Sequence, residues 1–222
     1  MKLVVASLLG LMLLCPLGSS AALYSFSCGT NNLATDCATS EAYLSLEVVD
    51  TTVGESISAS FTFTNVGPLL THTKEIWIDD DFGILDIANA VKSQSAGVNY
   101  TDLVVSSQNV GGLPTFVAEA ETNVANVGGG GAANGLTSGA TASVSPEYLM
   151  FDIALNGVET TFADLITALN SGTLRAGIHV GSYASGGSEK FSSVSAVPVP
   201  AAAWLFGTAL IGFIGLSRRT GV

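Results

Sequence analysis

The chain has 222 residues, of which 18 are acidic and seven are basic, and its formal net charge is −11 at pH 7. All the acidic residues lie between Asp36 and Glu189, an interval with only three basic residues, and Lys190 follows directly after it. Such an acidic body repels phosphate backbones and anionic membrane surfaces, which argues against nucleic acid as a partner. The length suits one domain of ordinary size with its own hydrophobic core.

Residues 1–22 carry the pattern of a secretory signal peptide. The stretch has a lysine at position 2, continues through an apolar run over residues 3–14 and ends in small residues that suit a signal peptidase. The apolar run is shorter than a membrane-spanning helix requires. We expect cleavage after Ala21 or Ala22.

Removal of the signal peptide leaves two cysteines, Cys28 and Cys37. An even number of cysteines in an exported chain predicts a disulfide. The alternative is a pair of free thiols. A metal site would need further ligands, and no cluster of His or Cys residues lies nearby in the sequence.

The middle of the chain has the pattern of short strands separated by Gly, Asn, Ser and Pro. Residues 56–65 alternate apolar and polar side chains, with Phe61 and Phe63 on the apolar face, and residues 43–50 form a partner strand. Further strands are expected over residues 74–81, 98–107, 115–122, 147–155, 173–183 and 189–194. This spacing predicts a mainly β fold, an antiparallel β-sandwich, for residues 23–196.

One short amphipathic helix is expected within residues 160–173. Thr161 caps it, Asp164 completes a capping box and Gly172 ends it. We expect its apolar stripe to cover one end of the sandwich, with a partner-binding helix as the alternative. The Gly-rich segment 123–145 lacks the Lys-Ser/Thr ending of a phosphate-binding loop and is read as a surface loop.

The chain ends in a proline motif at residues 197–200, an uncharged run at 201–217 and a basic end at 218–222. The residues singled out here are Val197, Pro198, Val199, Pro200, Ala201, Trp204, Arg218 and Arg219. As a helix, residues 201–216 span roughly 24 Å, slightly short of a bilayer core of about 30 Å, and we predict one transmembrane helix here. Arginines that flank a span stay in the cytoplasm, so the body is placed outside. The alternative is a buried core helix, which apolarity on all sides disfavours.

This order of features resembles the PEP-CTERM sorting signal of Gram-negative bacteria, in its VPxPA variety. The resemblance covers residues 197–222, and Val199 stands where the family has its name-giving Glu. It implies that an exosortase, an integral-membrane cysteine protease, recognises the proline motif at the inner membrane and passes the protein to the cell surface or extracellular matrix. Residues 162–191 also resemble a segment of exported PEP-CTERM proteins of unknown function, which implies no catalytic residues.

Three aspartates, Asp79, Asp80 and Asp81, stand at the end of the strand expected over residues 74–81. Calcium needs several oxygen ligands that converge on one point. Consecutive strand residues alternate between faces, so a solvated turn is preferred and Ca²⁺ binding is the alternative. No other cofactor is expected.

The surroundings of His72, Trp77, His179 and Tyr183 would distinguish a hydrolase from a glycan-binding protein. A hydrolase would place His179 or His72 in a cleft beside an acidic residue and a nucleophile, although the sequence has no nucleophile-elbow motif. A glycan-binding surface would expose Trp77 and Tyr183 together. We predict a non-catalytic structural or adhesive protein whose partners include matrix exopolysaccharide. The alternative is a carbohydrate- or Ca²⁺-binding module, and a secreted hydrolase is a distant alternative.

Overall fold

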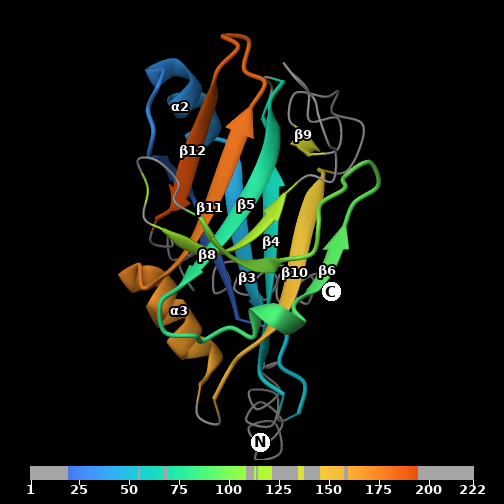
Figure 1. Cartoon of the computed structure of the whole chain (residues 1–222). Coiled ribbons are helices and arrows are strands. Elements are labelled where there is room, and N and C mark those ends of the chain that lie inside the picture. The colour runs from blue at the N-terminus through green and yellow to red at the C-terminus, as the bar shows by residue number, and fades with distance from the viewer. Residues whose placement is uncertain are drawn as a thin grey trace, which may run out of the picture.

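The computed structural model of the chain describes residues 20–54, 56–67, 70–108, 113, 115–121, 135–137, 146–157 and 160–194. Within them the fold is mainly β, as predicted, with antiparallel sheets and short helices (Figure 1). For the body of the chain the sequence predicted one helix, whereas the described residues contain two α-helices, α2 (Ala34–Glu41) and α3 (Phe162–Ser171).

The first sheet has five strands in the order β1-β3-β4-β10-β6. These are β1 (Ala21–Tyr24), β3 (Leu44–Asp50), β4 (Ser58–Asn65), β10 (Tyr148–Ala154) and β6 (Val91–Gln94). The predicted hairpin of residues 43–65 is confirmed, since β3 and β4 pair in antiparallel register with Val48 opposite Phe61. The short strands β1 and β6 were not predicted.

The second sheet has the order β2-β12-β11-β5-β8-β7, and β9 pairs with β5. These are β2 (Phe26–Cys28), β12 (Ser188–Ser193), β11 (Leu174–Gly181), β5 (His72–Asp80), β8 (Phe116–Glu121), β7 (Val104–Gln108) and β9 (Leu136–Thr137). The strand expected over residues 98–107 is shorter than predicted, since β7 begins only at Val104. At the middle of the sheet, β5 pairs with β11 on one side and with β8 on the other.

One hydrophobic core contains side chains from both sheets. Phe61 and Phe63 of the first sheet and Ile76 and Ile178 of the second are at most 1% exposed within it. The predicted alternation along β4 is therefore confirmed for its aromatic residues. Ile57, which the same pattern placed in the core, lies just before β4 and is only half-buried.

Helix α3 follows the signals in its sequence. The Thr161 side chain accepts a hydrogen bond from the Asp164 N–H, and the Asp164 carboxylate accepts one from the Thr161 N–H. Gly172 ends the helix with a φ of 78°, a conformation that glycine adopts without strain. Leu165 and Leu169 are buried in the main core, which confirms the predicted core placement.

The two predicted trafficking segments fall largely outside the described residues. Residues 1–19 and the tail from residue 195 onward are not described, so the signal-peptide and membrane-helix hypotheses stay predictions. Among the residues that are described, no helix is long and apolar enough to cross a membrane. Ala21 and Ala22, assigned to the signal peptide from sequence, pair with Val49 and Val48 in the first sheet.

Candidate functional site

The predicted disulfide joins the end of β2 to helix α2. Cys28 and Cys37 are linked by an S–S bond of 2.04 Å, and their Cα atoms are 5.5 Å apart. The backbone around Cys28 is also held by strand pairing, since β2 pairs with β12 and Cys28 lies opposite Phe191. The disulfide therefore fastens α2 to an edge strand of the second sheet.

Glu189 of β12 lies beside this disulfide and is 1% exposed. Its carboxylate accepts hydrogen bonds from Thr30 Oγ1 at 2.6 Å, from the Asn32 N–H at 3.0 Å and from the Leu33 N–H at 2.7 Å. Leu33 is the N-cap residue of α2 and has no side chain that could cap the helix. Glu189 therefore supplies the cap from another part of the chain.

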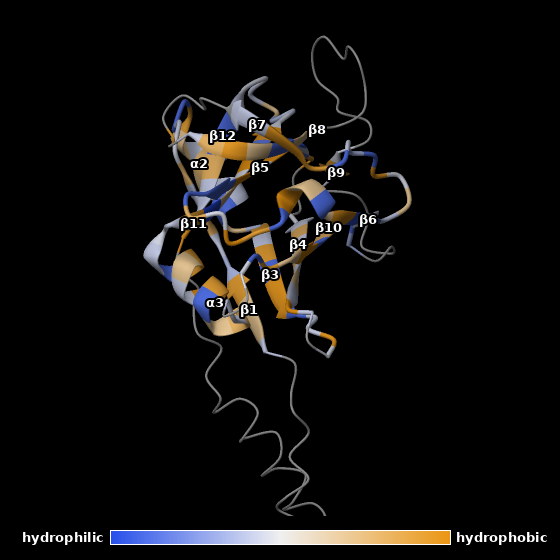
Figure 2. Ribbon diagram, turned by 60° about the horizontal axis from the view of Figure 1, so that its bottom comes forward, coloured by the Kyte–Doolittle hydropathy of each residue, from blue (hydrophilic) through white to orange (hydrophobic). Residues whose placement is uncertain are grey.

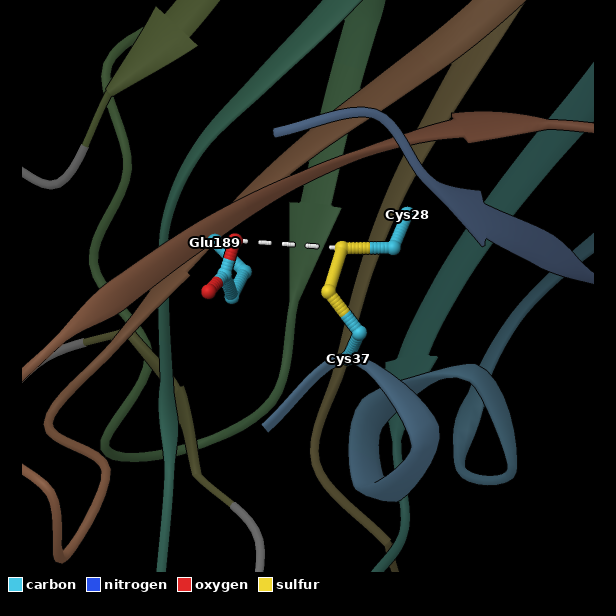
Figure 3. A group of neighbouring side chains, drawn as sticks. All are labelled: Cys28, Cys37 and Glu189. Atoms are coloured by element: carbon cyan, nitrogen blue, oxygen red, sulfur yellow. Dashed lines mark hydrogen bonds between the residues drawn. A yellow bond between two sulfur atoms is a disulfide. The ribbon is translucent and has the colours of Figure 1, made fainter. Parts of the chain in front are cut away.

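The carboxylate also approaches the disulfide itself. Glu189 Oε2 is 3.8 Å from Cys28 Sγ, and a dashed line marks this contact in Figure 3. Because a disulfide sulfur carries no proton, this is a close contact rather than a donated hydrogen bond. Burial alone would raise the pKa of Glu189, but the three donors outweigh it and hold the pKa below its ordinary value.

Further hydrogen bonds join α2 to the loop that connects β11 and β12. The hydroxyls of Ser40 and Tyr183 lie 2.5 Å apart in the interior. Ser185 donates to the Asp36 carboxylate, and the Asn32 side chain donates to the Ser188 carbonyl. We call Cys28, Cys37, Glu189 and these hydrogen-bonded partners the α2 clamp.

The three aspartates considered for Ca²⁺ do not converge on one point. Asp79 is 1% exposed and binds the Arg175 guanidinium of the neighbouring strand. Asp80 accepts hydrogen bonds from the backbone N–H groups of Ile84 and Leu85. The expected solvated turn is correct only for Asp81, which is exposed, and wrong for the other two aspartates.

His179 lies in a small polar and aromatic cluster on the face of β5 and β11 opposite the main core. Its Nδ1 atom is 2.9 Å from Glu75 Oε2, and its ring stacks on Trp77 with centroids 6.0 Å apart. Burial raises the pKa of Glu75, but the hydrogen bond with His179 outweighs it and lowers that pKa. The cluster thus brings together a histidine and an acidic residue, as a hydrolase would.

Among the described residues, the nucleophile that a hydrolase would need is not found beside this pair. His179 Nε2 is buried and has no hydrogen-bond partner among the described residues, so no described hydroxyl is placed for activation through it. His72 lies elsewhere, with its Nδ1 atom 3.1 Å from Thr137 Oγ1. The described part of the chain therefore offers no Ser-His-acid arrangement around either histidine.

The aromatic residues that a glycan-binding surface would use are buried. Trp77 is 2% exposed and stacks on Phe116, with ring centroids 5.7 Å apart. Tyr183 is 6% exposed, and burial raises its pKa above the ordinary tyrosine value. Neither ring presents a face to solvent, so this pair does not form a stacking surface for sugars.

A shallow groove of about 610 Å³ lies between the β1 edge of the first sheet and α3, which are neighbours in Figure 2. Its apolar lining includes Ala22, Ile57, Phe162 and Ile166, with Asp50 among the polar residues. A groove so open and weakly polar lacks the converging polar groups of a specific small-molecule site.

The sorting and anchor residues predicted in the tail lie outside the described residues. They are Val197, Pro198, Val199, Pro200, Ala201, Trp204, Arg218 and Arg219. Sequence reasoning found Cys28 and Cys37 but missed Glu189, because no local pattern links it to a helix so far away in the chain. No family model, curated protein or solved structure matches the chain.

Proposed function

We propose that the chain is an exported bacterial protein with a structural or adhesive role at the cell surface or in the extracellular matrix. It is not an enzyme in this proposal. Its body is a β-sandwich, and its C-terminal tail is a PEP-CTERM-type sorting signal that an exosortase processes at the inner membrane of a Gram-negative bacterium. The structural or adhesive role is proposed because a disulfide and one shared hydrophobic core hold the body together.

The observation that carries the proposal is the Cys28–Cys37 disulfide within the α2 clamp. Structural disulfides persist in oxidising compartments outside the cytoplasm. The two sheets share one core, which supports the sandwich architecture. The buried side chains of Trp77 and Tyr183 favour this role over glycan binding.

The test is the intact mass and subcellular fraction of the protein from its native host, with and without exosortase activity. We expect loss of the segment beyond Pro198–Pro200 and release to the surface only when the exosortase is active. Replacement of Pro198 and Pro200 by alanine should block both, whereas the matched change Pro146→Ala in the body should not. An uncut tail in the inner membrane under both conditions would contradict the sorting proposal.

A further inference from the structure

The α2 clamp contains three groups that are metal ligands when its disulfide is open. The sulfur atoms of Cys28 and Cys37 and a carboxylate oxygen of Glu189 all lie within 4.8 Å of one another (Figure 3). In the part of the chain that the structure describes, this is the sole group of three such ligand atoms. Thiolate and carboxylate ligands together suit Zn²⁺ and similar thiophilic divalent cations.

We infer that reduction of the Cys28–Cys37 disulfide opens a binding site for a thiophilic divalent cation, with Cys28, Cys37 and Glu189 as its protein ligands. In the oxidised protein the two sulfurs are bonded to each other and the site is closed. Disulfide and bound cation are therefore alternative states of the same three side chains. This inference does not depend on the proposed function.

The first argument is that the sulfurs stay close after reduction. The backbone around Cys28 is held by pairing with β12 and by the Gly29 N–H, which donates to the Lys190 carbonyl. The helix of Cys37 is held by the Glu189 cap, the Ser40–Tyr183 contact and the Ser185–Asp36 hydrogen bond. Opening the disulfide removes one of several contacts that hold the two cysteines near each other. A cation would therefore lose little binding free energy to ordering the site.

The second argument is the charge of Glu189. Its side chain is almost fully buried, and its three hydrogen-bond donors are a hydroxyl and two backbone N–H groups, all neutral. Deeply buried carboxylates are normally paired with a cationic side chain or a metal ion. No salt bridge involves Glu189 among the described residues. A cation between the sulfurs would be the first formally positive group in contact with this carboxylate.

The chemistry balances in two steps. A dithiol reductant gives two electrons and two protons to the disulfide and becomes a disulfide itself, leaving two protein thiols. The cation then displaces both thiol protons, which pass to solvent, and binds the two thiolates and the carboxylate. Water completes a four-coordinate site. Because the cation binds only the dithiol form, it shifts the redox equilibrium towards that form.

The test uses the full chain, purified in mild detergent and carrying Cys15→Ser so that only the clamp cysteines remain. The disulfide is reduced with a phosphine, which becomes the phosphine oxide with oxygen from water, and Co²⁺ is then titrated as a coloured stand-in for Zn²⁺. We expect a thiolate-to-cobalt charge-transfer band in the reduced protein and none in the oxidised protein. Zn²⁺ should displace the Co²⁺ and abolish the band.

The matched variants separate a ligand from a structural neighbour. Glu189→Gln should weaken binding by at least about 10-fold, because loss of a mere outer-shell partner of a metal site already costs about 10–100-fold and Glu189 is proposed as a direct ligand. Glu41→Gln should bind as the parent does, since Glu41 contacts the Cys28 N–H from outside the cluster. Cys37→Ser keeps the Glu189 cap and should lose the band, so the test remains decisive even where Glu189→Gln does not fold.

Two outcomes would overturn the inference. In one, the reduced protein binds Co²⁺ no more tightly than the Cys28→Ser/Cys37→Ser double variant, which retains both histidines. In the other, a folded Glu189→Gln protein, verified by circular dichroism, binds Co²⁺ with unchanged affinity. The first result removes the site, and the second removes Glu189 from it.

Discussion

The carboxylate of Glu189 accepts a 2.7 Å hydrogen bond from the backbone N–H of Leu33, 156 positions earlier in the chain. Leu33 is the N-cap residue of α2, which begins at Ala34, and its own side chain cannot cap a helix. The N–H group of this N-cap residue therefore depends on a residue of β12 for its hydrogen-bond acceptor. This relationship makes the N-terminal segment and the last described strand a single structural unit.

Replacement of Glu189 by alanine should destabilise the protein. The change leaves the Thr30 hydroxyl and the N–H groups of Asn32 and Leu33 without their acceptor. Loss of a buried hydrogen-bond partner costs about 1–3 kcal/mol, which urea denaturation under oxidising conditions can measure. The control Glu41→Ala removes an exposed acceptor and should cost less. Equal effects of the two changes would contradict the assigned role of Glu189.

The same residue predicts how stability depends on pH. Because the folded state holds the pKa of Glu189 below its ordinary value of 4.5, the carboxylate contributes stability that is fully present above that value. This contribution is lost as the pH falls through the lowered pKa. The difference in free energy of unfolding between the parent and Glu189→Gln should stay constant between about pH 7 and pH 5 and shrink at lower pH. A difference that grows on acidification would reverse the assigned sign.

Removal of the disulfide should destabilise the protein, because the unfolded chain then has more conformational freedom. Cys28 and Cys37 are nine positions apart, and the chain-entropy model gives about 2.5–3 kcal/mol for so short a loop. The Cys28→Ala/Cys37→Ala protein should show this loss in urea denaturation, and a reductant should bring the parent down to a similar stability. A reductant should leave the double variant unchanged. A far-UV spectrum like that of the parent would show that the remaining contacts of the clamp hold α2.

Two glycines of β11 should respond differently to alanine. A Cβ atom at Gly177 would lie 2.7 Å from Phe116 Cζ and 3.0 Å from Trp77 Cε3, both in rigid buried rings. Such overpacking costs about 1–3 kcal/mol and should lower the melting temperature and alter the Trp77 fluorescence. At Gly181 the Cβ would meet the end of the Lys74 side chain, which can move aside. Gly181→Ala should therefore cost less, and the reverse order would contradict the assigned packing.

The parts of the fold that could be predicted are those with local causes. Helix α3 has its own N-cap at Thr161 and its own C-terminal glycine at Gly172, so a few adjacent residues define each of its boundaries. The hairpin of β3 and β4 could be read from the alternation around Phe61 and Phe63, because a strand with one face in the core repeats every second residue.

The parts that could not be predicted depend on partners distant in the chain. Asp79 was expected in a solvated turn, but Arg175, 96 positions later, lies opposite it in the sheet. Its guanidinium binds the Asp79 carboxylate and offsets the cost of burying that charge. Helix α2 has little apolar pattern, since its position is fixed by the disulfide and by Glu189. A glycan-binding surface would have exposed Trp77, but its ring stacks on Phe116, and both rings pack beside Gly177.

The pairing of Ala21 and Ala22 with Val49 and Val48 gives the predicted site of signal-peptide cleavage a structural consequence. The two expected cuts, after Ala21 and after Ala22, would leave three and two of the four residues of β1. The backbone of β3 would then lose its partner at Val49 alone or at both Val48 and Val49. Unpaired strand edges are where β proteins accept a strand from another chain. The choice of cleavage site would therefore set how much of β3 is open to pairing with a second molecule.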